Sequence, residues 1–146
     1  MPLTNPYQRY QHTAAQTADG GQLLIMSYEA IQRWLGRAET AIDADKIEIA
    51  HTALISAQEI LRNLQLNLNH EQGGEVAANL QKIYGYLISE LVWANIDKDK
   101  DRICAVRDMV TPLLDAWRVA VVKARREASA RTAQATSTML RQVRGA

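Results

Sequence analysis

Glu48 and His51 stand three positions apart, which is the spacing of a metal-ligand pair on a helix. In di-iron helical bundles, two Glu-x-x-His pairs and two further inward carboxylates surround the metals. Neither His12 nor His70 has a glutamate three residues before it, so the second pair is missing. One pair cannot fill a metal's coordination shell, and we therefore expect His51 to be a solvated or edge residue.

The single cysteine, Cys104, has no CxxC partner. A nucleophilic cysteine would need a nearby base and an activating environment, whereas a free cysteine is usually a small buried residue in a reducing compartment. We therefore expect Cys104 to be buried or semi-buried. The glycine pairs 20–21 and 73–74 lack the spacing of a phosphate-binding fingerprint and are interpreted as loop breakers. The sequence predicts neither catalysis nor a cofactor.

Length and charge narrow the class of protein. The 146 residues fit one domain, and 17 basic residues nearly balance 16 acidic ones, for a net charge of +1. Nucleic acid is not an expected partner, because phosphate binding needs a concentrated positive surface. No apolar run approaches the length of about 20 residues that spans a bilayer. Residues 1–16 also lack a secretory signal pattern, so we expect a cytoplasmic protein without membrane insertion.

Four stretches of the chain repeat apolar residues every three or four positions, as helices with one buried face do. The first begins after Asp19, a predicted helix N-cap with Gln22 in the capping-box position. The second begins at Asp45, with Glu48 in the same position. The residues predicted to face the core in these two stretches are Leu24, Tyr28, Ile31, Leu35, Ala38, Ile42, Ile47, Ala50, Leu54, Ala57, Leu61, Leu64 and Leu68.

The third and fourth helices follow the second glycine pair. The third is predicted from Glu75 to about Asn95, and the fourth follows the polar run 97–101, with Pro112 predicting a kink or a break inside it. Their predicted core positions are Val76, Leu80, Ile83, Leu87, Leu91, Ile103, Val106, Val110, Leu113, Trp117 and Val121.

These stretches predict an all-α fold, an antiparallel up-down-up-down four-helix bundle, because short connections make consecutive helices neighbours. The predicted divisions are an extended N-terminal arm over 1–18, the bundle over 19–125, and a basic, flexible tail over 126–146. We expect the tail to be frayed helix or disorder.

Three of the helices carry a second apolar stripe beside the one that builds a core. Its members are Leu23, Met26, Ala30, Trp34, Ile49, Ala53, Ile60, Ala77, Tyr84 and Ile88, and further round lie Ile55, Leu66, Tyr86 and Trp93. Apolar surface of this extent widens the core, forms an oligomer interface or receives a ligand, and periodicity leaves all three open. A groove of Leu, Ile and Met edged by Tyr and Trp would suit an incoming amphipathic helix.

The order of short motifs along the chain is more specific than the periodicity. The motifs are Asn-Pro-Tyr-Gln-Arg-Tyr at 5–10, Thr-Ala at 17–18, Gln-Leu-Leu-Ile-Met-Ser-Tyr-Glu-Ala at 22–30, Gly-Gly-Glu-Val-Ala at 73–77, Ile-Tyr-Gly-Tyr at 83–86 and Asp-Ala-Trp at 115–117. From residue 5 to about residue 122 the chain resembles the FliS family of flagellar export chaperones. It departs from the family at 19–20, where Asp-Gly replaces Ser-Pro, and at Ser27 and Gly85, which replace Leu and Asp.

The resemblance implies a cytoplasmic chaperone that binds the disordered C-terminal segment of newly made flagellin. Covering this segment would prevent premature polymerisation and keep the subunit ready for type III export, and the chaperone would help to present it to the export gate protein FlhA. The alternatives are a self-associating structural or regulatory bundle and a metal-binding bundle of the di-iron class.

The residues that we expect to bind the partner come from the arm and from the second stripes. They are Tyr7, Tyr10, Leu23, Met26, Trp34, Ile49, Ile60, Tyr84 and Ile88. Pro6 stiffens the arm, and its two tyrosines offer flat amphipathic anchors. Our hypothesis is that, without flagellin, the arm lies across part of the groove and is displaced or re-laid when flagellin binds.

Overall fold

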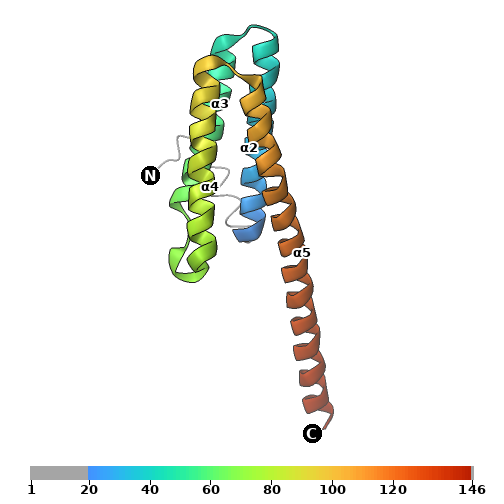
Figure 1. The fold of residues 1–146 in the computed structure, drawn as a ribbon. Helices are drawn as coiled ribbons and strands as arrows, with labels where there is room; N and C mark the ends of the chain where they lie inside the picture. The colour runs from blue at the N-terminus through green and yellow to red at the C-terminus, as the bar shows by residue number, and fades with distance from the viewer. Residues whose placement is uncertain (1–19, 146) are drawn as a thin grey trace, which may run out of the picture.

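The structure is a computed structural model that describes residues 20–145, and these residues form four α-helices without strands. The helices are α2 (Gly20–Asp43), α3 (Ile47–Leu66), α4 (His70–Asp97) and α5 (Lys100–Arg144). Each helix packs against its neighbours in the chain, and α5 closes the ring against α2. The chain runs alternately up and down through this ring, so the predicted antiparallel four-helix bundle is confirmed (Figure 1). The predicted arm and the Asp19 cap lie outside the described residues.

The turn between α2 and α3 corrects the predicted start of the second helix. Asp45 adopts a left-handed conformation with φ of 56°. Its N–H donates to the Ile42 carbonyl at 3.0 Å, and the Lys46 N–H donates to the Ala41 carbonyl at 2.8 Å. This is the Schellman pattern that ends a helix. Asp45 therefore closes α2 and does not cap α3, whose N-cap position holds Lys46 without a side-chain cap bond.

Helix α4 starts earlier than the sequence predicts. Asn69 is its N-cap, and the Asn69 side chain accepts a hydrogen bond from the Gln72 N–H at 3.0 Å. Gly74, with φ of 48° and ψ of −119°, interrupts the helix, and Glu75 begins the second of its two pieces. The predicted glycine breaker thus lies inside α4, because the asparagine cap has already started a first turn before it.

Helix α5 continues through Pro112 to Arg144, so the predicted break at the proline is wrong. Pro112 and Asp108, whose carbonyl loses its helical partner, are both exposed, and water can satisfy the freed carbonyl. Val121 is the last buried residue of α5, and the helix then leaves the bundle with every described residue from 122 onward exposed (Figure 1). The structure is helical where frayed helix or disorder is expected, and the division at 125 stays a prediction.

The core combines the predicted main stripes of all four helices. Its largest fully buried side chains are Tyr28, Tyr84, Ile31, Leu35, Leu54, Leu61, Leu87, Leu91, Ile103, Val106 and Val110. Two predicted core residues are exposed instead: Ile47, at 46%, and Val76, at 66%. Ile47 is the first residue of α3, and Val76 follows closely after the interruption at Gly74. The helical spacing of apolar residues continues to the ends of the helices, whereas the burial of those residues does not.

Candidate binding surface

His51 lies at the bundle surface and contacts α4 rather than a metal-ligand cluster. Its Nδ1 accepts a hydrogen bond from Asn95 Nδ2 at 2.9 Å, and Lys98 Nζ donates to Asn95 Oδ1 at 2.7 Å. His51 itself is exposed, as an edge residue should be. No group of three or more His, Cys, Asp or Glu side chains suited to a metal ion occurs among the described residues.

Cys104 is exposed, so the expected burial is wrong. It follows the buried Ile103 by one position, which turns its side chain about 100° around the helix and away from the core.

The nine expected partner-binding residues separate into three groups. Tyr7 and Tyr10 lie outside the described residues. Ile60 and Tyr84 are core residues, exposed by only 2% and 1%. The remaining five are accessible: Leu23, Met26, Trp34 and Ile88 are half-buried, and Ile49 is 55% exposed.

Four of the accessible residues lie along one side of the bundle, which we call the α2/α3 face: Leu23, Met26, Trp34 and Ile49. The three on α2 share a helix face with Ala41, because the successive spacings of three, eight and seven residues are each close to whole turns of a helix. Ala41 and Ile49 line one pocket together, so this face of α2 borders α3. The α2/α3 face is therefore a partly exposed apolar strip, while Ile88 lies apart on α4.

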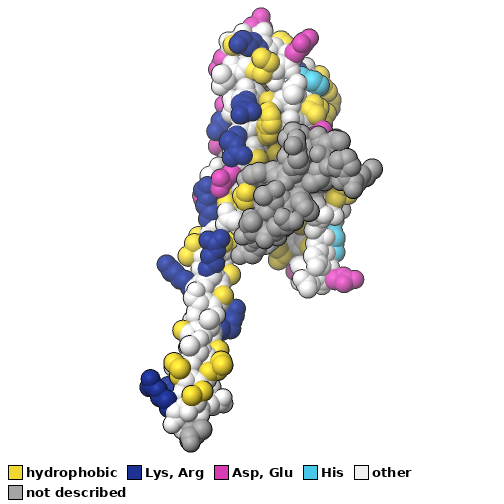
Figure 2. Space-filling model, turned by 180° about the vertical axis from the view of Figure 1, so that it is seen from behind, with side chains coloured by type: hydrophobic (Ala, Val, Ile, Leu, Met, Phe, Trp, Pro, Cys, Tyr) yellow, Lys and Arg dark blue, Asp and Glu magenta, His cyan; other side chains and the backbone are white. Residues whose placement is uncertain are grey.

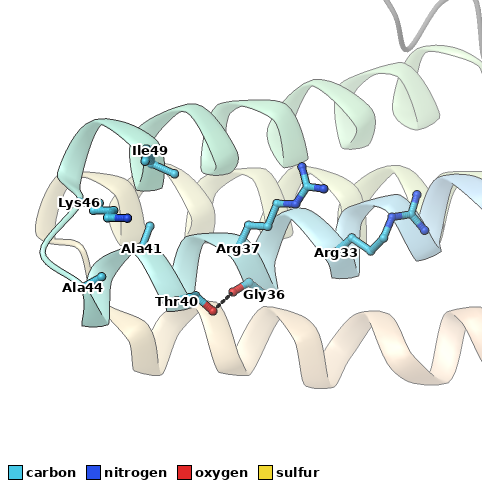
Figure 3. Close-up of a pocket in the computed structure, with 8 residues that line it drawn as sticks. All are labelled: Arg33, Gly36, Arg37, Thr40, Ala41, Ala44, Lys46 and Ile49. Carbon is cyan, nitrogen blue, oxygen red and sulfur yellow. Dashed lines mark hydrogen bonds between the residues drawn. The ribbon is translucent and has the colours of Figure 1, made fainter.

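The pocket, which we call the α2/α3 pocket, lies at the end of this strip near the turn between the two helices. It has a volume of about 600 Å³ and small or apolar residues on its floor, with basic side chains beside them (Figure 3). Its lining is Arg33, Gly36, Arg37, Thr40, Ala41, Ala44, Lys46 and Ile49. The Arg37 guanidinium carbon lies 4.8 Å from the centre of the Trp34 ring, which joins the pocket to the strip.

Tyr84 and Tyr28 form a buried pair in the core. Their hydroxyl groups hydrogen-bond to each other, and their ring centres are 6.5 Å apart. Burial raises the pKa of both hydroxyls above the ordinary value of 10.0, so both tyrosines are neutral in the folded protein at physiological pH. For Tyr28, hydrogen bonds from the side chains of Tyr84 and Trp117 partly offset the rise in pKa. Tyr84 is therefore a core residue in this structure, and its side chain is not accessible to a partner.

A second exposed apolar surface, the α4/α5 face, consists of Tyr86, Trp93 and Met109, with exposed fractions of 53%, 52% and 38%. Tyr86 and Trp93 share a helix face with Glu90, and the Glu90 carboxylate accepts a hydrogen bond from Arg102 of α5 at 3.0 Å. The two aromatic residues therefore border α5. The sequence signal for them was their size and helical spacing outside the core stripes.

These surfaces define a class of protein: a helical bundle with accessible apolar, aromatic-edged faces. No helix among residues 20–145 is long and apolar enough to cross a bilayer. The comparisons with known proteins agree with this class and narrow it.

The family described as flagellar protein FliS matches residues 3–125. The flagellar secretion chaperone FliS of Bacillus subtilis (strain 168) is 34% identical over 127 residues, covering 87% of this chain and 94% of that protein. Its counterpart in Salmonella typhimurium is 31% identical over 107 residues, covering 73% and 79%. A crystal structure of a flagellar chaperone from bacteria has the same fold, with a TM-score of 0.69 at 20% identity over 80% of this chain and 95% of that one.

The chain belongs to the FliS family of flagellar secretion chaperones. The family match ends at residue 125, so the exposed end of α5 lies beyond it.

Proposed function

We propose that this protein is a cytoplasmic export chaperone that binds the C-terminal segment of flagellin. In this role it covers a segment that would otherwise polymerise, and it delivers the subunit to the flagellar type III export gate, with FlhA as the receiving protein. Family membership supports the general role. The observation that carries the specific proposal is the apolar surface left accessible on two sides of a well-filled core.

The two faces suit a segment that folds as it binds. Ordering a disordered chain costs several kcal/mol, and such complexes typically bury about 1,000–3,000 Å² to offset that cost. In this proposal the segment wraps from the α2/α3 face to the α4/α5 face and so adds the apolar contacts of both faces. Trp34, Tyr86 and Trp93 supply large amphipathic side chains that are typical of binding energy hot spots.

Of the residues expected to bind the partner, we assign direct contact to Leu23, Met26, Trp34, Ile49 and Ile88. Ile60 and Tyr84 support these contacts from the core beneath. Tyr7 and Tyr10 belong to the arm, which we expect to be displaced from the binding surface or rearranged when flagellin binds.

Isothermal titration calorimetry with a peptide of the flagellin C-terminal segment tests this proposal. Ile49→Ala should weaken binding by about 1 kcal/mol, because it removes most of a half-exposed apolar side chain. Met139→Ala is the matched control, since Met139 is 65% exposed on the end of α5 that projects from the bundle. No binding by the unaltered chain would refute the proposal, and equal losses in the two variants would refute the assignment to the α2/α3 face.

Two further measurements test the arm hypothesis and the alternative of a self-associating bundle. Deleting residues 2–12 should change peptide affinity if the arm occupies the binding surface, and an unchanged affinity would refute the arm hypothesis. Light scattering with and without the peptide addresses self-association, since a stable dimer that the peptide does not alter would favour a structural or regulatory bundle.

A further inference from the structure

We propose that the α2/α3 pocket is a docking site for a helical segment of another protein that carries carboxylates one helical turn apart. The inference rests on the geometry and charge of α2 and α3 and does not require that the partner be flagellin.

The charge of the pocket is the first observation. Arg33, Arg37 and Lys46 line it, all three are exposed, and none forms an ion pair within the described part of the chain. Cations on nearby α5 behave differently. Lys100 reaches Asp43 of α2 at 2.6 Å, and Arg107 reaches Glu39 at 3.0 Å. Asp43 and Glu39 of α2 thus pair with α5, whereas the three pocket cations have no ion-pair partner within the described part of the chain.

The spacing of the cations matches a helix. Arg33 and Arg37 are four residues apart, which places their helix positions about 6 Å apart along α2. They extend from the same side of α2, and Lys46 stands at the opposite end of the pocket (Figure 3). Glutamates at positions i and i+4 of an approaching helix have the same spacing, so each carboxylate can meet its own guanidinium group.

The floor of the pocket permits close approach. Gly36, Thr40 and Ala44 succeed one another at intervals of four residues, so a strip of small side chains runs beside Arg33 and Arg37 (Figure 3). A Cβ atom added at Gly36 would meet nothing within 4 Å, which shows that the space above it is open. The Thr40 hydroxyl donates to the Gly36 carbonyl at 3.1 Å and thus needs no further acceptor. Helix axes approach most closely where the side chains between them are small.

The distribution of acidic residues along the chain indicates that the segment in the α2/α3 pocket comes from another protein. Residues 1–19 contain one acidic residue, Asp19, and the projecting part of α5 beyond Val121 contains one, Glu127. Neither segment can supply two carboxylates one turn apart. Figure 2 shows basic side chains in dark blue distributed along the projecting end of α5, which therefore would be repelled from the pocket.

The test uses the full chain and two synthetic alanine- and leucine-based helical peptides, one with glutamates at i and i+4 and one with glutamines there. Fluorescence anisotropy measures affinity, and amide shifts in NMR spectra locate the site. We expect the glutamate peptide to bind about tenfold more tightly at low salt, because its two glutamates form two exposed ion pairs that each add about threefold. The shifts should centre on Gly36, Thr40 and Ile49.

Three variants make the test specific. Combined Arg33→Glu, Arg37→Glu and Lys46→Glu changes should abolish the preference for the glutamate peptide. Gly36→Leu should weaken both peptides without loss of fold, since the new side chain enters open space and leucine is a better helix former. The control is the triple change Lys123→Glu, Arg126→Glu and Arg131→Glu, an equal change of charge on exposed positions of α5.

Several outcomes would overturn the inference. They are equal affinity for the two peptides, amide shifts centred elsewhere, or an equal effect of the control triple change. Inorganic phosphate that displaces the peptide at millimolar concentration would assign the pocket to small anions instead. Self-association that disappears on charge reversal of the pocket would assign it to a second copy of this chain. A failed flagellin titration would leave these measurements unaffected, so the two proposals fail separately.

Discussion

The buried tyrosine pair makes a quantitative prediction about what holds the bundle together. Tyr28 of α2 and Tyr84 of α4 lie on helices that share no direct backbone packing, so their hydroxyl hydrogen bond crosses the centre of the ring of helices. The exposed fractions of the two residues are 0% and 1%, and water cannot replace the partner if one hydroxyl is removed. Phenylalanine keeps the ring and removes only that hydroxyl.

The two single substitutions should differ in cost. Tyr28→Phe leaves the Tyr84 hydroxyl without its partner and also removes the acceptor of Trp117, so we expect a loss of about 2 kcal/mol of unfolding free energy. Tyr84→Phe leaves Tyr28 with Trp117, and we expect about 1 kcal/mol. The double variant removes both hydroxyls, and its cost should be close to that of Tyr28→Phe alone. The predicted coupling energy is thus about 1 kcal/mol.

Urea denaturation followed by far-ultraviolet circular dichroism measures these free energies, provided that the dependence on urea is the same in all variants. Tyr86→Phe is the matched control on the same helix. Its ring is 53% exposed, and the change should alter stability by less than about 0.5 kcal/mol. Single-variant costs that add to within about 0.3 kcal/mol would refute the argument, because additivity means that the two hydroxyls do not interact.

Three further predictions concern stability. Burial raises the pKa of both core tyrosines above that in the unfolded chain, so their contribution to the free energy of unfolding is fully present below pH 10 and is lost above it. Urea titrations over a pH series should show stability falling above pH 10 by up to about 1.4 kcal/mol per pH unit for each tyrosine. A flat profile would contradict this prediction. Gly74→Ala should destabilise the bundle by about 1–2 kcal/mol, because φ is 48° at that position. Gly36→Ala should stabilise the bundle by up to about 1 kcal/mol, because Gly36 is helical and an added Cβ would enter open space. Thermal unfolding of both variants tests this, and shifts of the same sign would count against the prediction. Removing residues 126–146 should change unfolding free energy by less than about 0.5 kcal/mol, since all described side chains there are exposed, and a larger loss in urea denaturation would show that the segment packs on the bundle.

The helices and the core were predictable because both follow from helical spacing. Leu35, Leu54 and Leu91 are buried where the spacing places them. The turn at Asp45 was not predictable from the same pattern, because an aspartate followed by a glutamate three residues later fits a helix start, while a left-handed residue that ends the previous helix also favours aspartate. The choice depends on how sharply the chain must reverse, which is a tertiary property.

The binding surface was predictable only in part, for a related reason. Ile49 and Ile60 belong to the same predicted stripe of α3, yet one is 55% exposed and the other 2%. Spacing gives the direction in which a side chain points, but its burial depends on how closely the neighbouring helix approaches at that level. The small residues at the end of α2 open the pocket beside Ile49, whereas Ile60 lies in the main core cluster. Basic residues near small ones were visible in the sequence, but their lack of acidic partners required the structure.

The two proposed binding activities share α2 and α3 but depend on different forces, and salt distinguishes them. Salt screens the attraction between exposed charges, with a Debye length of about 8 Å at physiological ionic strength, so binding at the α2/α3 pocket should weaken as salt rises. Contacts with Leu23, Met26 and Trp34 depend on apolar burial, which strongly hydrated salts such as sulfate strengthen. A segment that uses only the apolar strip should therefore bind at least as tightly in sulfate, while a segment that also enters the pocket should lose affinity. This salt dependence measures how far along α2 a partner extends.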